Sequence, residues 1–367
     1  EFDALVIGAG AAGVGAAIAL IHAGIGNFAV VDRGEVGASF AAWPAETRFI
    51  TPSFPTNSIG MVDINSIAPG ASPGYSLRLE HPTGQQYASH LKDVVKFYQL
   101  PINENTEVHE IASTPEGFLV GTSIGTLRTK HVIWAAGEYQ YPQLSGFPGA
   151  ELCQHTATIP SYNELNGESF IIIGGCESGV DAAYHLALQG KKVQLFDSGC
   201  PWESTSSEPS IALSPYSLER MRSKEFINNV ELCAETLISS VEQRGNTYQV
   251  VTADGECFET NQTPLLAHGF AGSHTLVADL FEAREDGYPL LNENDESTIS
   301  PGLFLCGPAV RHDNLIFCFI YKYRQRFAVV AKAIATSLDL PAEGLETYRA
   351  FGMYLDDLSC CGKECVC

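Results

Sequence analysis

The chain is poor in positive charge. Its 367 residues include 21 Lys and Arg against 43 Asp and Glu, which gives a formal net charge of −22 at pH 7. Nucleic acids and anionic membrane surfaces repel such a chain, so we expect neither as a partner. The apolar start, residues 4–23, contains loop glycines and follows Glu1 and Asp3 instead of Lys or Arg. It therefore does not have the pattern of a signal peptide or of a membrane-spanning helix.

The sequence also lacks the ligand spacings of common zinc sites, and it contains no Cys-x-x-Cys pair. No metal site is therefore predicted in the body of the chain. Four of the 11 cysteines are instead crowded into the last eight residues, at Cys360, Cys361, Cys365 and Cys367. Because no export signal is expected and most other cysteines stand singly, we expect a cytoplasmic protein with reduced thiols.

What the chain does contain is two glycine-rich loops, each entered from an apolar run. The first run, residues 4–7, leads into Gly8, Gly10 and Gly13. In a dinucleotide-binding fold these glycines make a tight turn, admit the pyrophosphate and let the next helix pack on the strand. The helix predicted over 11–23 points its N-terminus at the phosphates.

An acid completes the first motif. A second strand is predicted over 28–31 and ends at Asp32, where a carboxylate accepts the ribose hydroxyls of an adenosine half. The residues predicted here to contact the first dinucleotide are Gly8, Gly10, Ala11, Ala12, Gly13, Asp32 and Arg33.

The second loop follows the apolar run 170–173. It keeps Gly174 and Gly179 but has Cys176 where the middle glycine is expected, so a side chain crowds the pyrophosphate. The next strand ends at Asp197, which favours the free 2′-hydroxyl of NADH over the 2′-phosphate of NADPH. No arginine follows within ten residues, although one acid alone leaves NADPH open. The residues predicted to contact the second dinucleotide are Gly174, Gly175, Glu177, Ser178, Gly179 and Asp197.

Two such motifs predict an α/β chain with two Rossmann-like dinucleotide-binding domains, the second inserted in the first. We expect the first domain over 1–151 and 271–367 and the inserted domain over 152–270. Two dinucleotide folds in one chain are typical of a flavoprotein that holds FAD tightly and is reduced by NADH or NADPH.

Two later segments resemble the parts of two-dinucleotide flavoproteins that pack against the flavin. One runs into Ala136 and Gly137, and the other ends at Gly307, where Pro308 replaces the usual Asp. A long helix is predicted over 314–335, with its N-terminal N–H groups aimed at the flavin. The remaining predicted FAD contacts are Trp43, Arg48 and Asn314.

The two loops and several other segments carry a resemblance to a known family. These segments are 39–44, 51–54, 134–139, 174–179, 213–216, 321–329 and 353–357. Along the whole chain the sequence resembles flavin-containing monooxygenases, and more narrowly the bacterial flavoproteins of the CzcO type that are associated with cation efflux. The resemblance implies a pyridine nucleotide-disulfide reductase-like fold, FAD, NAD(P)H and monooxygenase activity on a small-molecule substrate. The family's fingerprint around a histidine is retained only as His155 and Tyr162.

The tail, defined as residues 360–367, leaves three roles open. Its thiols could pass electrons from the flavin to an outside disulfide, bind a soft metal such as zinc or copper(I), or form disulfides that pin the terminus. Two hypotheses therefore stand beside the monooxygenase. One is a thiol or metal-thiolate reductase with the tail cysteines as catalytic groups, and the other is a non-enzymatic, flavin-bearing metal sensor. The helix predicted ahead of the tail would suit exchange across a homodimer.

Overall fold

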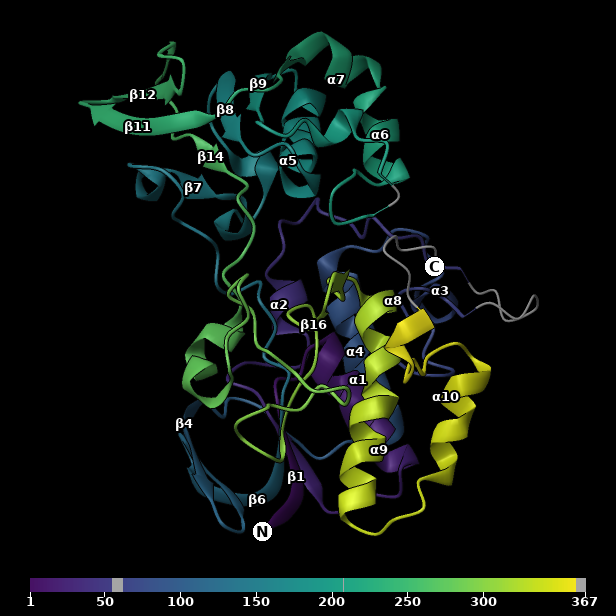
Figure 1. The fold of residues 1–367 in the computed structure, drawn as a ribbon. Helices are drawn as coiled ribbons and strands as arrows, with labels where there is room; N and C mark the ends of the chain where they lie inside the picture. Colours follow the sequence, from purple (N-terminus) through teal and green to yellow (C-terminus); the bar gives the residue numbers. More distant parts are fainter. Residues whose placement is uncertain (55–61, 207, 361–367) are drawn as a thin grey trace. The chain divides into compact units, whose positions relative to one another are not determined.

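The computed structural model describes residues 1–54, 62–206 and 208–360, without the side chain of Cys360. The chain forms two compact units (Figure 1). Unit 1 comprises Glu1–Ala41, Pro52–Glu138 and Gly272–Cys367, and unit 2 comprises Ala42–Thr51 and Tyr139–Ala271. Compared with the predicted boundaries, segments 42–51 and 139–151 belong to unit 2 instead of the first domain.

A seven-stranded sheet forms the centre of unit 1. Its order is β3-β2-β1-β6-β5-β4, with β15 also paired to β6. Strands β3, β2, β1, β6 and β15 are parallel neighbours, whereas β5 and β4 continue the sheet antiparallel. The strands are β1 (Phe2–Ile7), β2 (Phe28–Val31), β3 (Ile102–Asn103), β4 (Val108–Thr114), β5 (Gly117–Thr122), β6 (Gly125–Trp134) and β15 (Leu303–Leu305). Because parallel strands share their carboxyl edge, the loops after β1, β6 and β15 lie together.

Helices cover the sheet of unit 1. Helix α1 (Ala11–His22) packs against α9 (Phe327–Ser337) and α4 (Gly84–Tyr98), as can be followed in Figure 1. The contact with α9 is close, because a Cβ added to Gly15 would lie 2.1 Å from Cε2 of Phe327. The other helices are α2 (Ala38–Ala41), α3 (Pro73–Leu77), α8 (Ile320–Tyr323) and α10 (Glu346–Ala350), with the 3₁₀ helices η6 (Ser273–Leu280), η7 (Arg324–Arg326), η8 (Glu343–Leu345) and η9 (Leu358–Cys360).

The predicted helix over 314–335 is wrong at its start. Strands β16 (Arg311–His312) and β17 (Leu315–Ile316) pair as a hairpin, with Asp313 at φ 47° and Asn314 in its turn. Asp and Asn tolerate the left-handed region better than other L residues, so this pair favours a turn over the first turn of a helix. The helix begins only at α8 and passes through η7 into α9.

Unit 2 contains a five-stranded parallel sheet of order β10-β9-β8-β14-β7 and a separate antiparallel sheet of order β11-β12-β13. The parallel strands are β7 (Gln154–His155), β8 (Ser169–Ile173), β9 (Lys192–Phe196), β10 (Val230–Cys233) and β14 (Leu265–Leu266). The antiparallel strands are β11 (Ile238–Arg244), β12 (Thr247–Thr252) and β13 (Cys257–Thr260). The helices are α5 (Glu177–Leu188), α6 (Pro215–Met221) and α7 (Lys224–Asn229), with the 3₁₀ helices η2 (Ala150–Leu152), η3 (Thr156–Thr158), η4 (Tyr162–Glu164) and η5 (Pro201–Glu203). Apolar side chains from both sides of the α5–β9 contact form a buried core.

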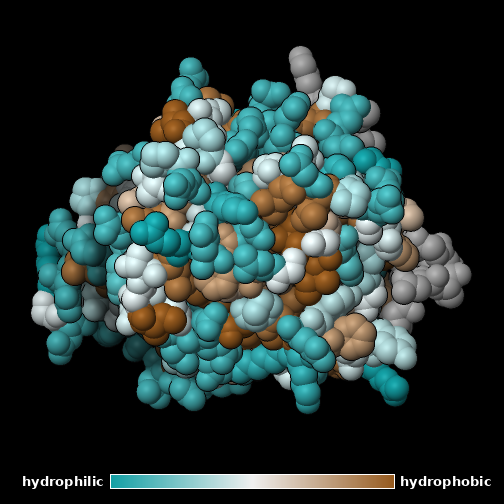
Figure 2. Space-filling view, turned by 90° about the horizontal axis from the view of Figure 1, so that it is seen from below, coloured by the Kyte–Doolittle hydropathy of each residue, from teal (hydrophilic) through white to brown (hydrophobic). Residues whose placement is uncertain are grey.

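The surface is mixed in polarity despite the acidic composition. Figure 2 shows a patch of hydrophobic side chains among hydrophilic ones on the face drawn there. Within the described residues, every helix is too short or too polar to cross a lipid bilayer.

Candidate dinucleotide-binding sites

The first glycine-rich loop is closely packed at its two outer glycines and open at its middle one. A Cβ added to Gly8, at φ +114°, would lie 2.3 Å from the carbonyl oxygen of Ala135, and one added to Gly13 would lie 1.8 Å from that of Gly8. At Gly10, by contrast, an added Cβ would have no atom within 4 Å. The outer two glycines therefore satisfy the packing of the protein, and the space at the middle one fits the pyrophosphate of a dinucleotide.

Asp32 is fixed against this loop from the end of β2. Its Oδ2 accepts the N–H of Ala9 at 2.6 Å and its Oδ1 accepts the N–H of Gly34 at 2.7 Å. The side chain is only partly buried. A carboxylate offers about four acceptor positions, so Asp32 keeps capacity for the hydroxyls of a ribose. Arg33 beside it is exposed.

The predicted flavin-side segments meet the first loop at the same sheet edge. The N–H of Ala135 donates to Ile7 at 2.8 Å, and the N–H of Cys306 donates to Trp134 at 2.9 Å. A Cβ added to Gly307 would lie 3.3 Å from Cβ of Ala12. The ends of β6 and β15 therefore border the loop, which brings Ala12, Ala136, Gly137 and Gly307 into one region of unit 1.

The second loop repeats the packing of the first. Gly174 has φ +102°, and a Cβ added there would lie 2.5 Å from the carbonyl oxygen of Ala267. A Cβ added to Gly179 would lie 1.8 Å from the carbonyl oxygen of Gly174. Sequence reasoning missed Ala267 and Gly269, the counterparts of Ala135 and Gly137. The available signal was that a short apolar run, here β14, is again followed by a small residue and a glycine.

Cys176 occupies the middle position of the second loop, where Gly10 stands in the first. It is the N-cap of α5 and is exposed as a residue. Partial burial of the thiol raises the pKa of Cys176, so the side chain is uncharged at neutral pH. The loop therefore presents a small neutral group to a pyrophosphate, and a thiolate would instead repel it.

Asp197, which directly follows β9, accepts hydrogen bonds from three backbone N–H groups. Its Oδ2 accepts the N–H of Gly175 at 2.7 Å, and its Oδ1 accepts those of Gly199 and Cys200 at 2.7 and 2.8 Å. The arrangement matches that of Asp32, with one additional N–H donor. Both predicted acids therefore lie where a ribose-binding carboxylate is needed.

Glu177 contacts protein groups from the first turn of α5. Its carboxylate accepts hydrogen bonds from the N–H and hydroxyl of Ser214 and from the hydroxyl of Ser217. Glu177 therefore anchors the start of α6 beside the loop. Ser178, the next predicted contact, is exposed.

The segment that carries Trp43 and Arg48 belongs to unit 2, whereas both side chains were predicted beside the flavin of the first domain. Glu46 accepts hydrogen bonds from Ser161 and from the N–H of Tyr162, and Thr47 donates to Asp181. These contacts tie the segment to unit 2. Segment 42–51 and its partners at residues 161–181 are more than 100 residues apart, so the local sequence does not indicate that they associate.

The retained fingerprint residues are packed inside unit 2. His155 Nε2 donates to the carbonyl oxygen of Gly269 at 3.0 Å, and its Nδ1 accepts the N–H of Ala157 at 3.1 Å. Burial lowers the pKa of His155, so the ring is neutral at neutral pH. Tyr162 is 1 % exposed and stacks on His185. Both residues have a structural role here.

The predicted catalytic cysteines lie outside the described residues: Cys361, Cys365 and Cys367 entirely, and Cys360 in its side chain. Among the other cysteines, six are free thiols: Cys153, Cys176, Cys200, Cys233, Cys257 and Cys306. In the described ranges no group of three or more His, Cys, Asp or Glu side chains is arranged to hold a metal ion.

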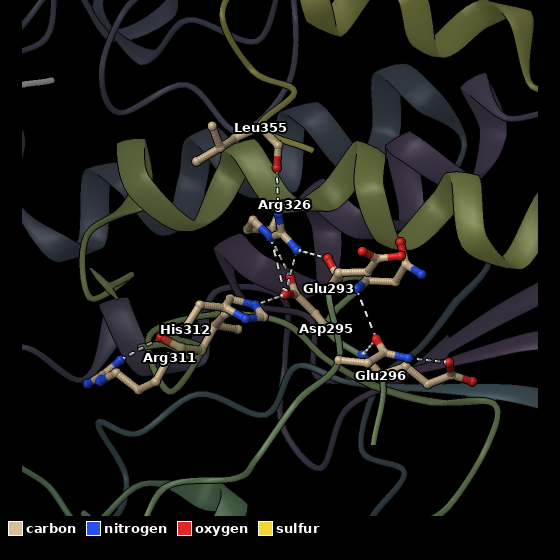
Figure 3. A network of polar contacts seen from close by, with 10 residues as sticks. Glu293, Asp295, Glu296, Arg311, His312, Arg326 and Leu355 are labelled. Carbon is tan, nitrogen blue, oxygen red and sulfur yellow. Dashed lines mark hydrogen bonds and ion pairs between the residues drawn. The ribbon is translucent and has the colours of Figure 1, made fainter. Parts of the chain in front are cut away.

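A buried ionic network precedes the tail, and sequence reasoning missed it. Arg326 is 1 % exposed and Asp295 is 0 % exposed, and the guanidinium donates to both carboxylate oxygens at 2.8–2.9 Å. His312 Nε2 lies 2.5 Å from Oδ1 of the same carboxylate. Arg326 also donates to the carbonyl oxygens of Glu293 and Leu355 (Figure 3). The network joins the hairpin, the turn before α9 and the segment leading to the tail.

The residues just before the tail are anchored to the same place. The N–H of Leu355 donates to the carbonyl oxygen of Gln325 at 3.0 Å. Arg349 makes a two-pronged contact with Asp356 at 2.8 and 3.0 Å and lies over the ring of Tyr354. We call residues 353–359 the root of the tail.

The two packed loops, their acids and the two α/β units define a flavoprotein that binds two dinucleotides. The chain belongs to the pyridine nucleotide-disulphide oxidoreductase family, whose model matches residues 5–307. Members of this family bind FAD and use NAD(P)H, so these are the cofactors of this oxidoreductase.

Particular relatives differ in how much of the chain they match. Bacilliredoxin reductase Bdr of Bacillus subtilis (strain 168) is 25 % identical over 340 residues, which cover 90 % of this chain and 97 % of that protein. The structure of bacillithiol disulfide reductase Bdr from Staphylococcus aureus superposes with a TM-score of 0.73 at 21 % identity, over 92 % of this chain and 98 % of that one. The uncharacterized oxidoreductase CzcO of Bacillus subtilis (strain 168) is 25 % identical over 197 residues, or 51 % of this chain and 52 % of that protein. The CzcO-type resemblance therefore covers about half of the chain and not its whole length.

Proposed function

We propose that this oxidoreductase is a disulfide reductase. The observation that carries the proposal is the likeness to bacilliredoxin reductase over 97 % of that protein's length. In the reaction, NAD(P)H and a proton reduce one disulfide: the S–S bond breaks, two S–H bonds form and NAD(P)⁺ is released. FAD, when bound, carries the two electrons between nicotinamide and disulfide.

The chain's own residues have binding and positioning roles in this proposal. Gly10 leaves room for the FAD pyrophosphate and Asp32 accepts its ribose hydroxyls. In unit 2, the loop around Cys176 takes the pyrophosphate of the nicotinamide dinucleotide, and Asp197 takes its ribose. Glu177 positions α6 beside that loop.

The proposal assigns the first disulfide to the tail. The sequence has no Cys-x-x-Cys, which is the usual redox pair of flavin-dependent disulfide reductases, so the described cysteines offer no pair of that kind. Cys306 follows β15 directly, but it is buried, and burial raises its pKa well above the usual range. A thiol that stays protonated is a poor nucleophile and a poor partner in thiol exchange. The tail has four cysteines.

The contacts of the root support this assignment, because they attach the segment just before the tail to unit 1. Leu355 is held at Gln325 and Arg326, immediately before Phe327, which packs on Gly15 in α1. Helix α1 starts at the first loop, so these contacts link the root, through the start of α9, to the helix that carries the predicted FAD loop. Eight residues of extended chain span at most about 26–29 Å, which is the upper limit on how far the tail thiols reach from the root.

The proposal is tested with FAD-loaded protein, NADH or NADPH, and a small aromatic disulfide in the absence of oxygen. We expect nucleotide oxidation that requires the disulfide, and a rate at least about tenfold lower in a chain ended after Ser359. Cys257→Ser, which removes an exposed thiol of β13, is the control and should keep the full rate.

Two other results would redirect the proposal. Full activity of the shortened chain would exclude the tail and leave direct reduction of the disulfide. Oxidation of nucleotide only in air, with an oxygenated product, would favour the monooxygenase activity that the sequence resemblance implies.

A further inference from the structure

The ribose-binding end of β9 has little free acceptor capacity and no positive charge close in sequence. Asp197 already accepts three backbone N–H groups, from Gly175, Gly199 and Cys200. Of the roughly four acceptor positions of a carboxylate, about one remains. That position can accept a hydrogen bond from a ribose hydroxyl. An ionised phosphate has no proton to donate to it.

The geometry of this acid is rigid because the loop packs against an aromatic ring. A Cβ added to Gly175 would lie 2.2 Å from Cζ3 of Trp202 and 2.8 Å from Cβ of Asp197. The ring, the glycine backbone and the acid thus form one packed layer. The N–H that holds Oδ2 is part of that layer, so Asp197 cannot turn away from an incoming phosphate without breaking the contact.

The local charge is acidic. No Lys, Arg or His occurs between residues 193 and 219, whereas Glu203 lies in η5, six residues after Asp197, and is exposed. A 2′-phosphate placed here would meet the carboxylate of Asp197 with no cation from the same stretch of chain to offset it.

Two of the cations elsewhere in unit 2 are distant from Asp197 along the strand or paired with another acid. Lys192 is at the start of β9, about 13 Å from the end of that strand at about 3.3 Å per residue. Arg220 is buried and paired with Asp181 at 2.6 Å. The Lys and Arg residues of the unit are Arg48, Lys191, Lys192, Arg220, Arg222, Lys224 and Arg244.

From these observations we propose that the second site selects NADH over NADPH, with Asp197 as the residue that determines the specificity. The proposal deepens the function proposed above, since it names the dinucleotide that reduces the enzyme. It concerns binding, so it does not depend on which acceptor receives the electrons.

The test is a calorimetric titration of the FAD-loaded full chain with NAD⁺ and with NADP⁺, which needs no turnover. NAD⁺ is expected to bind at least about tenfold more tightly. Asp197→Asn removes the charge and keeps one acceptor oxygen, and it should bring the two affinities to within about threefold of each other. Glu259→Gln, an exposed acid of β13 paired with Gln249, changes the net charge equally and should leave the ratio unchanged.

Three results would overturn the proposal: NADP⁺ binding as tightly as NAD⁺ to the unaltered chain, an unchanged ratio in Asp197→Asn, or an equal loss of ratio in Glu259→Gln. If NAD⁺ binds more tightly than NADP⁺ as expected but the enzyme does not reduce disulfides, only the proposal that a disulfide accepts the electrons is rejected. The ratio of the two affinities therefore tests the nucleotide preference separately from the disulfide reductase activity.

Discussion

At the scale of single residues, the two loops differ most tellingly at their middle position, which is Gly10 in the first and Cys176 in the second. The outer glycines, Gly8 and Gly13 in the first loop, are required by contacts inside the protein itself. Gly10 is different, because nothing in the protein approaches the place of its missing side chain. Its counterpart in the second loop is Cys176, so the second site accommodates a side chain where the first does not have one. The first site is accordingly the better candidate for a tightly held dinucleotide.

Gly10→Ala tests this distinction. The backbone at Gly10 has φ −82°, which alanine adopts readily, so the variant should fold with an unchanged thermal midpoint. Its Cβ would take space that the pyrophosphate needs, and FAD affinity should fall by about tenfold or more. Flavin absorbance after gel filtration measures the bound fraction. Gly26→Ala, also in open space, is the control, and equal flavin retention in both variants would contradict the assignment.

At the scale of elements, long-range polar contacts hold the termini of unit 1 to its sheet. His131 near the end of β6 donates from Nδ1 to the carbonyl oxygen of Asp3 at 2.8 Å, and its Nε2 accepts from Ser337 at the end of α9 at 2.8 Å. Arg326, which pairs with Asp295, holds the root of the tail by donating to the carbonyl oxygen of Leu355. Both contacts depend on charge state, and each gives a prediction.

His131 should make unit 1 sensitive to mild acid. Burial lowers its pKa below the usual 6.5, so the unfolded chain takes up the proton more readily than the folded one. The stabilising contribution is complete above about pH 6.5 and is lost as the pH falls through the lowered value. Urea unfolding at about pH 7.5 and about pH 5.5 should show a larger loss of stability in the unaltered chain than in His131→Gln. Equal losses would argue against a role of this ring.

Arg326→Met should destabilise the protein strongly, since it leaves the carboxylate of Asp295 buried without its cation. Loss of one partner of a buried pair costs about 3–5 kcal/mol. Arg349→Met removes a pair in which both side chains are nearly half exposed, and it should cost about 1 kcal/mol or less. Denaturant unfolding measures both, and similar values would show that the buried network carries little of the stability.

Sequence reasoning succeeded where the signal is local. A strand, a glycine loop, a helix and a second strand follow one another within a few dozen residues, and the structure has Asp32 and Asp197 directly after such second strands, β2 and β9. It failed for the hairpin around Asn314, where the turn preference of two residues outweighed the helical pattern that follows. The attachment of segment 42–51 to unit 2 and the Arg326–Asp295 pair join distant parts of the chain, and neither leaves a pattern in the local sequence.

At the scale of the whole molecule, one packing scheme is used twice. In unit 1 the loop after β1 packs under Ala135, and in unit 2 the loop after β8 packs under Ala267. The family match over residues 5–307 spans both units and accounts for FAD and NAD(P)H together. It ends before α8, the root and the tail. The features that we propose for passing electrons onward therefore lie largely beyond the part shared with the family model.

The central claim is that two electrons from a nicotinamide reach a disulfide. The most direct measurement is the number of thiols formed per NADH oxidised by the FAD-loaded full chain, without oxygen and with excess disulfide. The account predicts two thiols for each NADH oxidised. When the disulfide is omitted, NADH oxidation should stop once the protein's own flavin and disulfides have been reduced. Sustained NADH oxidation without thiol formation, or oxidation only after air is admitted, would contradict it.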